Sequence, residues 1–262
     1  MPAKQFLAGK TALVTGAANR IGAQIARTLH QNGANLIIHH RPASGNMSHA
    51  SSLNAQTLEA ELNSHRPGSA IRYQTDLSDI TEIESLAQKS SQAFGQLDIL
   101  INNASSFYAT TLGSITEQHW DDLLGSNLKA PMFLSQACYP VLKETKGCII
   151  NLLDIYATSP LKNHSLYCSA KAANQMLVKS LALDMAPAVR INGIAPGAIL
   201  WPEANNNNAN FVKERQQVIL DKIPLKKIGN PDNITQAVLF LINNDYITGE
   251  VITIDGGRLL TN

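Results

Sequence analysis

The chain has 262 residues, with 21 Lys and Arg against 20 Asp and Glu, a formal net charge of +1. This length suits one large α/β domain, and the interspersed charges give no basic tract that would bind nucleic acid or an anionic membrane. Residues 1–10 hold no apolar run of signal-peptide length, and no later segment approaches about 18 consecutive apolar residues. Cys138, Cys148 and Cys168 lack metal-ligand spacing. We therefore expect a cytoplasmic protein with reduced thiols and no metal, nucleic-acid or membrane partner.

Short apolar, β-rich runs recur along the chain with helix-period segments between them. These runs are Thr11–Thr15, Ala34–His39, Ala70–Gln74, Leu97–Ile101, Cys148–Leu153, Val189–Ile194 and Val251–Ile254. Their continuous hydrophobicity indicates that both faces of the sheet are covered, and the intervening helices favour parallel crossovers. We predict one α/β domain over residues 1–262, a doubly wound seven-stranded parallel sheet (a Rossmann fold) with helices on both faces. Functional residues are expected beyond the carboxyl ends of the strands.

The first run leads into a glycine-rich turn, Thr15-Gly16-Ala17-Ala18-Asn19-Arg20-Ile21-Gly22. Gly16 permits a tight turn, Gly22 lets helix and strand pack closely, and the helix N-terminus offers N–H groups to a pyrophosphate. Arg20 stands where a middle glycine is expected and adds a charge for a phosphate. The alternative is an ordinary turn that carries an exposed arginine.

The second run ends in His39-His40-Arg41, without the carboxylate that NAD-dependent enzymes usually place there for the ribose 2′-hydroxyl. Arg41 suits a 2′-phosphate instead, with His40 and Ser44 as further donors. We therefore predict NADPH as the cofactor. The Ser-rich stretch 42–52 is expected to form a loop over that phosphate.

Two further strand ends carry polar or aromatic residues. Asp76, which precedes Leu77, can accept a hydrogen bond from the adenine amine, while the small residues Ala104 and Ser105 let the cofactor lie against the backbone. Phe107 can hold a flat heterocycle against the nicotinamide by offset stacking worth about 0.5 to 1.5 kcal/mol. Phe107 as a plug of the core is the alternative.

A long helix is predicted over Glu117–Leu142, interrupted near Pro131. Asn127 in its middle indicates a kink or a bound water, because asparagine prefers caps and turns. The fifth run ends at Asp154, whose carboxylate would be costly there unless it is paired or protonated. Asp154 is therefore a candidate site residue, with a purely structural capping carboxylate as the alternative.

Tyr167 and Lys171 lie four residues apart at the start of a helix that is predicted to run to about Met185. This spacing places both side chains on one helix face, so the ammonium can favour the phenolate. A tyrosine pKa of about 10 would need to fall by roughly 2 to 3 units for efficient acid–base work. We expect Lys171 to lower the pKa of Tyr167.

After the sixth run, Pro196-Gly197 forms a sharp turn, and the Asn-rich stretch Trp201–Asn208 follows. We expect a substrate loop near residues 198–222, although the asparagines could be filler. A last helix is predicted over Pro231–Ile242.

Taken together, several motifs resemble the short-chain dehydrogenase/reductase family over essentially the whole chain. They are Thr15-Gly16 to Gly22, Asn102-Asn103-Ala104, Asn127, Tyr167 to Lys171, Pro196-Gly197 and the Gly249 to Gly257 ending. The resemblance implies that Tyr167 is the proton donor, that Lys171 holds the nicotinamide ribose and lowers the tyrosine pKa, and that Asn127 keeps a water in the proton relay. The resemblance and the motifs together imply a set of residues that contact the cofactor. These are Thr15, Gly16, Arg20, Ile21, Gly22, His40, Arg41, Ser44, Asp76, Leu77, Asn103, Ala104, Ser105, Tyr167, Lys171, Pro196 and Gly197.

The resemblance also implies a homotetramer in which the helix after Tyr167 packs on its mate. Ala173, Met176, Leu177 and Leu181 give that helix a stripe, but a stripe that faces the core would look the same.

Departures from the common family pattern point to a subgroup. These departures are Arg20, Ser105 and Asp154. Together with His40-Arg41 and Ser105-Ser106-Phe107-Tyr108, they resemble the pteridine reductases and the bacterial dihydromonapterin reductases. This implies NADPH-dependent reduction of dihydropterins such as dihydrobiopterin or dihydromonapterin, and also of dihydrofolate, to tetrahydro forms. The implied substrate contacts are Arg20, Ser105, Phe107, Asp154 and Tyr167, and the implied catalytic residues are Asp154, Tyr167, Lys171 and Asn127.

Asp154 fits such a substrate chemically. A carboxylate repels the alkoxide that forms when a ketone is reduced, whereas it can accept hydrogen bonds from the amino and N–H groups of a pterin. The C-terminal residues depart from the pattern of the parasite pteridine reductases, because Arg258 does not sit at the end of the chain. A carbonyl or 3-oxoacyl-carrier-protein reductase is the rival enzyme, and a non-catalytic NADPH-sensing protein is a third hypothesis.

Overall fold

A computed structural model describes residues 5–42, 46–200 and 209–261. Its centre is a parallel seven-stranded sheet in the order β3-β2-β1-β4-β5-β6-β7. The strands are β1 (Thr11–Val14), β2 (Asn35–His40), β3 (Ala70–Gln74), β4 (Ile99–Asn102), β5 (Cys148–Leu152), β6 (Arg190–Pro196) and β7 (Val251–Ile254). The predicted doubly wound sheet is confirmed, and each predicted strand overlaps an observed one.

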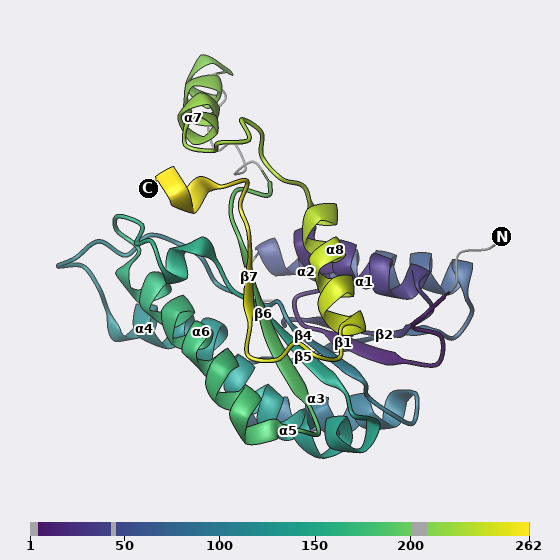
Figure 1. The fold of residues 1–262 in the computed structure, drawn as a ribbon. Coiled ribbons are helices and arrows are strands. Elements are labelled where there is room, and N and C mark those ends of the chain that lie inside the picture. The colour runs from purple at the N-terminus through teal and green to yellow at the C-terminus, as the bar shows by residue number, and fades with distance from the viewer. Residues whose placement is uncertain (1–4, 43–45, 201–208, 262) are drawn as a thin grey trace.

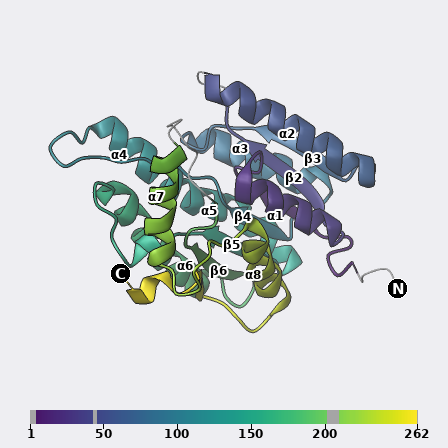
Figure 2. The same ribbon diagram turned by 90° about the horizontal axis from the view of Figure 1, so that it is seen from above.

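Helices cover both faces of this sheet (Figure 1). One face carries α1 (Arg20–Gln31), α2 (Asn46–His65) and α8 (Pro231–Asn243), and the other carries α3 (Ile80–Ala93), α5 (Ala130–Thr145) and α6 (Ser165–Met185). Helix α4 (Glu117–Leu124) lies against α6. Helix α7 (Ala209–Asp221) stands away from the sheet (Figure 1), beside the C-terminal residues (Figure 2). None of the helices within the described ranges combines the length and the apolar character needed to cross a bilayer.

Alternation within the strands explains why their sequences are apolar throughout. In β1, Ala12 and Val14 belong to the core beneath α1, α2 and α8, whereas Leu13 belongs to the core beneath α3, α5 and α6. In β2, Ile37 likewise joins the second core, opposite Leu36 of the first. Because successive side chains point to opposite faces and both faces are buried, neither face can be polar.

The long helix is interrupted near Pro131, as predicted. The break is a π-helix, η1, over Gly125–Lys129, and α5 then continues to Thr145 with Pro140 inside it. Pro131 lies in the first turn of α5, directly after this π-helical segment. Asn127 is therefore in the irregular segment, as its residue type indicated.

The expected loop over residues 42–52 is wrong, because α2 begins at Asn46. Ala55, Leu58 and Leu62 are buried at helical spacing, so packing on the sheet overrides the weak helix preference of the preceding serines. Residues 43–45 lie outside the described ranges, and so does Ser44 with them. In the expected substrate loop, Trp201–Asn208 also lies outside those ranges, and the later part is α7.

Candidate active site

The residues after β5 and at the start of α6 form one hydrogen-bonded group. The Tyr167 hydroxyl donates to Asp154 Oδ2 at 2.8 Å, and the Tyr156 backbone N–H donates to Asp154 Oδ1 at 2.9 Å. Asp154 is the N-cap of a short 3-10 helix, η2 (Ile155–Ala157), and Tyr167 is buried. Asp154 is thus both a cap and the partner of the predicted proton donor.

Lys171 completes this group from beneath the tyrosine ring. Its Nζ donates to the Leu152 carbonyl oxygen at 2.8 Å and lies 5.8 Å from the centroid of the Tyr167 ring. Burial lowers the pKa of Lys171 to about 8, although the charge of Asp154 opposes this. The predicted placement of the ammonium on the face of Tyr167 is therefore observed.

The expected fall in the pKa of Tyr167 is not observed. Burial raises this pKa above its ordinary value, and the charge and hydrogen bond of Asp154 raise it further. Lys171 lies beside the ring and bonds to the backbone, so the charge that the phenol oxygen meets directly is the carboxylate. Burial also raises the pKa of Asp154, against hydrogen bonds from Tyr156 and Tyr167. In this arrangement Tyr167 is therefore protonated at neutral pH.

A chain of buried asparagine amides links β4, β5 and α6 to η1. Asn102 Nδ2 donates to Asn151 Oδ1 at 2.9 Å, Asn151 Nδ2 donates to Asn174 Oδ1 at 2.8 Å, and Asn174 Nδ2 donates to the Asn127 carbonyl at 2.7 Å. Asn127 Nδ2 itself donates to the Leu123 carbonyl at 2.9 Å, and its buried Oδ1 has no partner within the described ranges. Sequence reasoning missed Asn151 and Asn174; an asparagine inside the apolar run of β5 was the available signal.

The glycine-rich turn is held closely against the end of β4. Asn103 Nδ2 donates to the Thr15 carbonyl at 2.8 Å, and Thr15 Oγ1 accepts the N–H groups of Asn103 at 2.9 Å and Ala104 at 3.0 Å. A Cβ at Gly22 would strike the Gly16 carbonyl oxygen and the Asn103 amide. The predicted close packing at Gly22 is thus present, and it leaves the start of α1 free to face a phosphate.

His39 holds the other side of this turn, a role that sequence reasoning missed. Its Nδ1 accepts the Gly16 N–H at 3.1 Å, and its carbonyl accepts the Ala17 N–H at 3.0 Å. Nε2 must then carry the proton, which it donates to the Thr75 carbonyl at 3.1 Å. Burial lowers the pKa of His39 to about 4, so the ring stays neutral. A histidine within an apolar strand was the signal.

The other predicted cofactor residues lie along the same edge. Arg20 is exposed at the start of α1, and Ser105 is exposed after β4, the neighbour of β1 in the sheet. Arg41 is exposed after β2, and burial lowers the pKa of the adjacent His40. The carboxylate of Asp76 accepts the Ser78 N–H at 2.9 Å. Ile21 and Leu77 are partly buried against the two cores, and Pro196 ends β6 just before Gly197.

Phe107 lies beside Tyr167 and is not a core plug, since 53% of its surface is exposed. Its ring stacks on His164 with centroids 4.9 Å apart and an interplanar angle of 18°, and it meets the Tyr167 ring edge-on at 4.8 Å. The structure therefore brings Phe107, Asp154, Tyr167 and Lys171 together.

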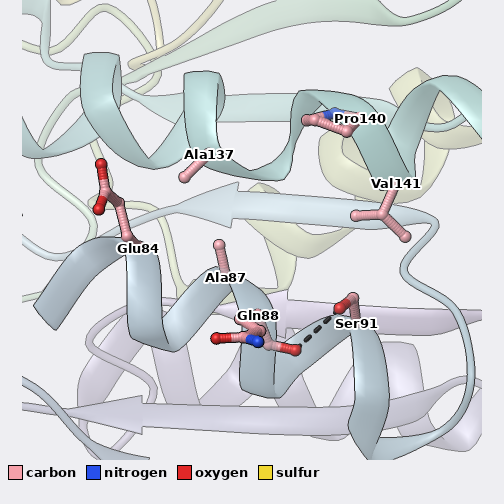
Figure 3. Close-up of a pocket in the computed structure, with 7 residues that line it drawn as sticks. All are labelled: Glu84, Ala87, Gln88, Ser91, Ala137, Pro140 and Val141. Atoms are coloured by element: carbon pink, nitrogen blue, oxygen red, sulfur yellow. Dashed lines mark hydrogen bonds between the residues drawn. The ribbon is translucent and has the colours of Figure 1, made fainter. Parts of the chain in front are cut away.

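A surface pocket of about 250 Å³ lies elsewhere, between α3 and α5 (Figure 3). Glu84 and Gln88 line it from α3, and Ala137 and Val141 line it from α5. None of the predicted site residues lines this pocket. Within the described ranges, no cluster of three or more His, Cys, Asp or Glu side chains could hold a metal ion.

Acidification should weaken the fold through His39. Because its pKa is about 4 in the fold and 6.5 in a free side chain, the unfolded chain takes up the proton first as the pH falls. The stabilisation is complete above pH 6.5 and is lost between pH 6.5 and about 4, by up to about 3 kcal/mol. Urea unfolding across this interval measures it.

The exposed His65 supplies the matched control for this measurement. His39→Gln should flatten the pH dependence of the unfolding free energy, whereas His65→Gln should not, and His30 remains in both variants. Equal slopes in the two variants would contradict the assigned role of His39.

Known proteins are similar to this chain in sequence and in fold. A family model described as enoyl-(acyl carrier protein) reductase matches residues 16–258. Pteridine reductase 1 of Leishmania tarentolae is 33% identical over 292 residues, which cover 95% of this chain and 96% of that protein. The 3-oxoacyl-(acyl-carrier-protein) reductase FabG of Thermotoga maritima is 30% identical over 258 residues, covering 97% and 99%.

A solved structure agrees with these relatives. A candidate short-chain alcohol dehydrogenase from Sinorhizobium meliloti 1021 superposes with a TM-score of 0.87 at 27% identity and covers 99% of this chain and 100% of its own. The sheet order, the glycine-rich turn and the Tyr167–Lys171 pair are thus accompanied by matches over nearly the full length. The chain belongs to the short-chain dehydrogenase/reductase family of NAD(P)-dependent oxidoreductases.

Proposed function

We propose that this oxidoreductase is an NADPH-dependent reductase of dihydropterins, with dihydrobiopterin, dihydromonapterin and dihydrofolate as candidate substrates. The observation that carries the proposal is the 2.8 Å hydrogen bond from Tyr167 to Asp154. A carboxylate beside the proton donor suits a substrate that presents N–H and amino groups. It does not suit a substrate that must develop an oxyanion at that point.

The residues of the site divide the work of such a reduction. When bound, the nicotinamide supplies the hydride that a ring carbon of the pterin receives. Tyr167 gives its proton to the adjacent ring nitrogen, and Asp154 accepts hydrogen bonds from the pterin while it orients the Tyr167 hydroxyl. Lys171 places a positive charge beneath the tyrosine, which stabilises the phenolate that is left after the proton moves. The exposed ring of Phe107 offers an aromatic face for the flat substrate.

The residues present fit a dinucleotide with a 2′-phosphate. The turn at Thr15–Gly22 leaves backbone N–H groups at the start of α1, and Arg20 adds a guanidinium there. Beyond β2, Arg41 follows two histidines and no carboxylate is present to bind a ribose 2′-hydroxyl. These features support NADPH over NADH.

A 3-oxoacyl-carrier-protein reductase is the second candidate function. The relative from Thermotoga maritima favours it. The carboxylate of Asp154 opposes it, because a developing alkoxide next to Tyr167 would be repelled. Steady-state assays with dihydrobiopterin, dihydromonapterin and an acetoacetyl thioester separate the candidates. Turnover of the thioester alone would overturn the pterin assignment, and no turnover of any would favour a non-catalytic NADPH-binding protein.

A homotetramer is proposed together with this function. On α6, Leu181 is buried in the core of the chain itself, so the expected stripe is in part a core-facing one. Met176 and Leu183 are 63% and 84% exposed on the same helix, and Trp120 of α4 is 52% exposed. Such large apolar side chains favour burial against another copy. Sedimentation that finds a stable monomer at micromolar concentration would contradict the proposal.

Replacing Asp154 with serine should abolish most pterin reduction. Loss of a positioned acid or base typically costs about 10²- to 10⁴-fold in rate, and the carboxylate makes no described contact with the residues expected to hold the phosphates. We therefore expect kcat with the pterin to fall by that factor while the Kd for NADPH changes little. Stopped-flow turnover and fluorescence titration of NADPH measure the two quantities.

Asp79→Ser is the matched control, because Asp79 also caps a helix with its carboxylate but lies at the start of α3. It should leave kcat unchanged and stability little changed, because serine caps a helix about as well as aspartate. If Asp154→Ser instead behaves like Asp79→Ser, then Asp154 is only a cap and the pterin assignment loses its main support.

Reversing the charge at Arg41 should reverse or abolish the preference for NADPH. A hydrogen bond to a charged group contributes about 1.5 to 3 kcal/mol, so Arg41→Asp should weaken NADPH binding by about tenfold or more while leaving NADH binding nearly unchanged. Binding constants for both nucleotides test this. Lys89→Asp makes the same charge change on an exposed turn of α3 and should not discriminate between them. NADPH affinity that survives Arg41→Asp would make Arg41 an ordinary surface residue.

A further inference from the structure

The C-terminal turn of the chain lies against the segment that follows β5. Arg258, the first residue of the 3-10 helix η3 (Arg258–Thr261), donates from Nη2 to the Tyr156 hydroxyl oxygen at 3.0 Å. Its guanidinium carbon also lies 5.6 Å from the centroid of the Tyr156 ring. The planar guanidinium thus holds both the face and the hydroxyl of one tyrosine.

The backbone around Arg258 is itself fixed to the edge of the sheet. Asp255 accepts the Gly257 N–H at 2.8 Å and the Leu259 N–H at 2.7 Å, so its carboxylate sets the turn. Gly197, just after β6, lets Asp255 approach, because a Cβ there would lie 2.6 Å from Asp255 Cβ. The backbone that carries the Arg258 side chain is therefore held in place by Asp255.

Tyr156 connects this support to the reacting groups. Its backbone N–H donates to Asp154 Oδ1 at 2.9 Å, which leaves Oδ2 to accept the Tyr167 hydroxyl at 2.8 Å. A movement of Tyr156 would therefore rotate the carboxylate away from Tyr167. Such a rotation changes the alignment of the proton donor, and reaction rates are sensitive to that alignment.

We propose that Arg258 is a positioning residue that holds Tyr156 and thereby fixes the Asp154 carboxylate for its hydrogen bond with Tyr167. The inference rests on the proposed function only in assigning proton delivery to Asp154 and Tyr167. The role of Arg258 in setting the carboxylate is a property of the free protein.

The charged and titratable groups around Asp154 come from three elements. Tyr156 faces it from η2, Tyr167 and Lys171 face it from α6, and Arg258 acts on it from η3. Lys171 and Arg258 are the two cations among them, and both favour the ionised carboxylate. Loss of Arg258 removes one of the cations and also frees Tyr156, so both effects make the Asp154 carboxyl harder to ionise.

Four variants test this role. Arg258→Met removes both the charge and the planar guanidinium, whereas Arg258→Lys keeps only the charge. Tyr156→Phe removes the hydroxyl that Arg258 binds but keeps the ring and the backbone N–H. Leu260→Ala is the control, because Leu260 lies in the same turn and is 87% exposed. Thermal melts establish that each variant is folded.

The first readout needs no substrate. In protein labelled with ¹³C at aspartate carboxyls, the Asp154 resonance is the one missing from Asp154→Asn. Its pKa should rise by about half a unit or more in Arg258→Met, less in Arg258→Lys and Tyr156→Phe, and not at all in Leu260→Ala. An unchanged pKa in folded Arg258→Met would overturn the proposal.

The second readout is the pH profile of kcat with the pterin that the enzyme turns over. Arg258→Met and Arg258→Lys should both lower kcat, by up to about 100-fold, with an unchanged Kd for NADPH. If Arg258→Lys has the same Asp154 pKa and the same kcat as the unchanged protein, the charge alone accounts for the effect of Arg258. The proposal that Arg258 acts by positioning Tyr156 is then wrong. If the carboxyl pKa shifts as expected but no pterin is reduced by any protein, the proposed function fails and the role of Arg258 stands.

Discussion

The buried chain of asparagine amides is the constraint on which the site depends. A buried amide is costly unless its donors and acceptor are paired, so Asn102, Asn151 and Asn174 can be accommodated only in one mutual arrangement. That arrangement connects β4 to β5, β5 to α6, and α6 to the carbonyl of Asn127 in η1. Rotation of α6 about its axis would break the chain at Asn174. The amides therefore fix the helix face on which Tyr167 and Lys171 lie.

The electrostatics of the site follow from burial more than from sequence neighbours. Tyr167 and Asp154 both resist ionisation because both are removed from water, and the hydrogen bond between them keeps one proton at the point of contact. Lys171 is buried as well, yet a carbonyl and a nearby carboxylate stabilise its ammonium. The result is a tyrosine that is protonated before a substrate binds.

The sequence was sufficient to predict the sheet because burial on both faces makes each strand apolar from end to end. It also located Asp154, Tyr167, Lys171 and Phe107, since strand ends and helix spacing bring such residues to one edge. The residue type of Asn127 indicated a kink, but the sequence could not show that the kink is a π-helix or that its carbonyl accepts a hydrogen bond from Asn174, 47 residues away. The prediction of a lowered pKa for Tyr167 was wrong because spacing shows only that Lys171 lies four positions along the helix. It does not show how far Tyr167 is removed from water. The role of His39 in holding the glycine-rich turn was missed because a histidine within an apolar strand is usually taken for a core residue.

The parallel topology also sets the order in which the two halves of the site can be assembled during synthesis. The described hydrogen bonds that the turn Thr15–Gly22 makes with distant residues come from His39, Asn54, Ile101, Asn103 and Ala104, all within the first 104 residues. The turn for the nucleotide can therefore form while most of the chain is still unmade, since N-terminal segments emerge from the ribosome first. The group around Asp154 waits for Tyr167 and for the final turn at Arg258. A chain shortened at its C-terminal end would keep the residues of the nucleotide turn and lose a support of the chemistry.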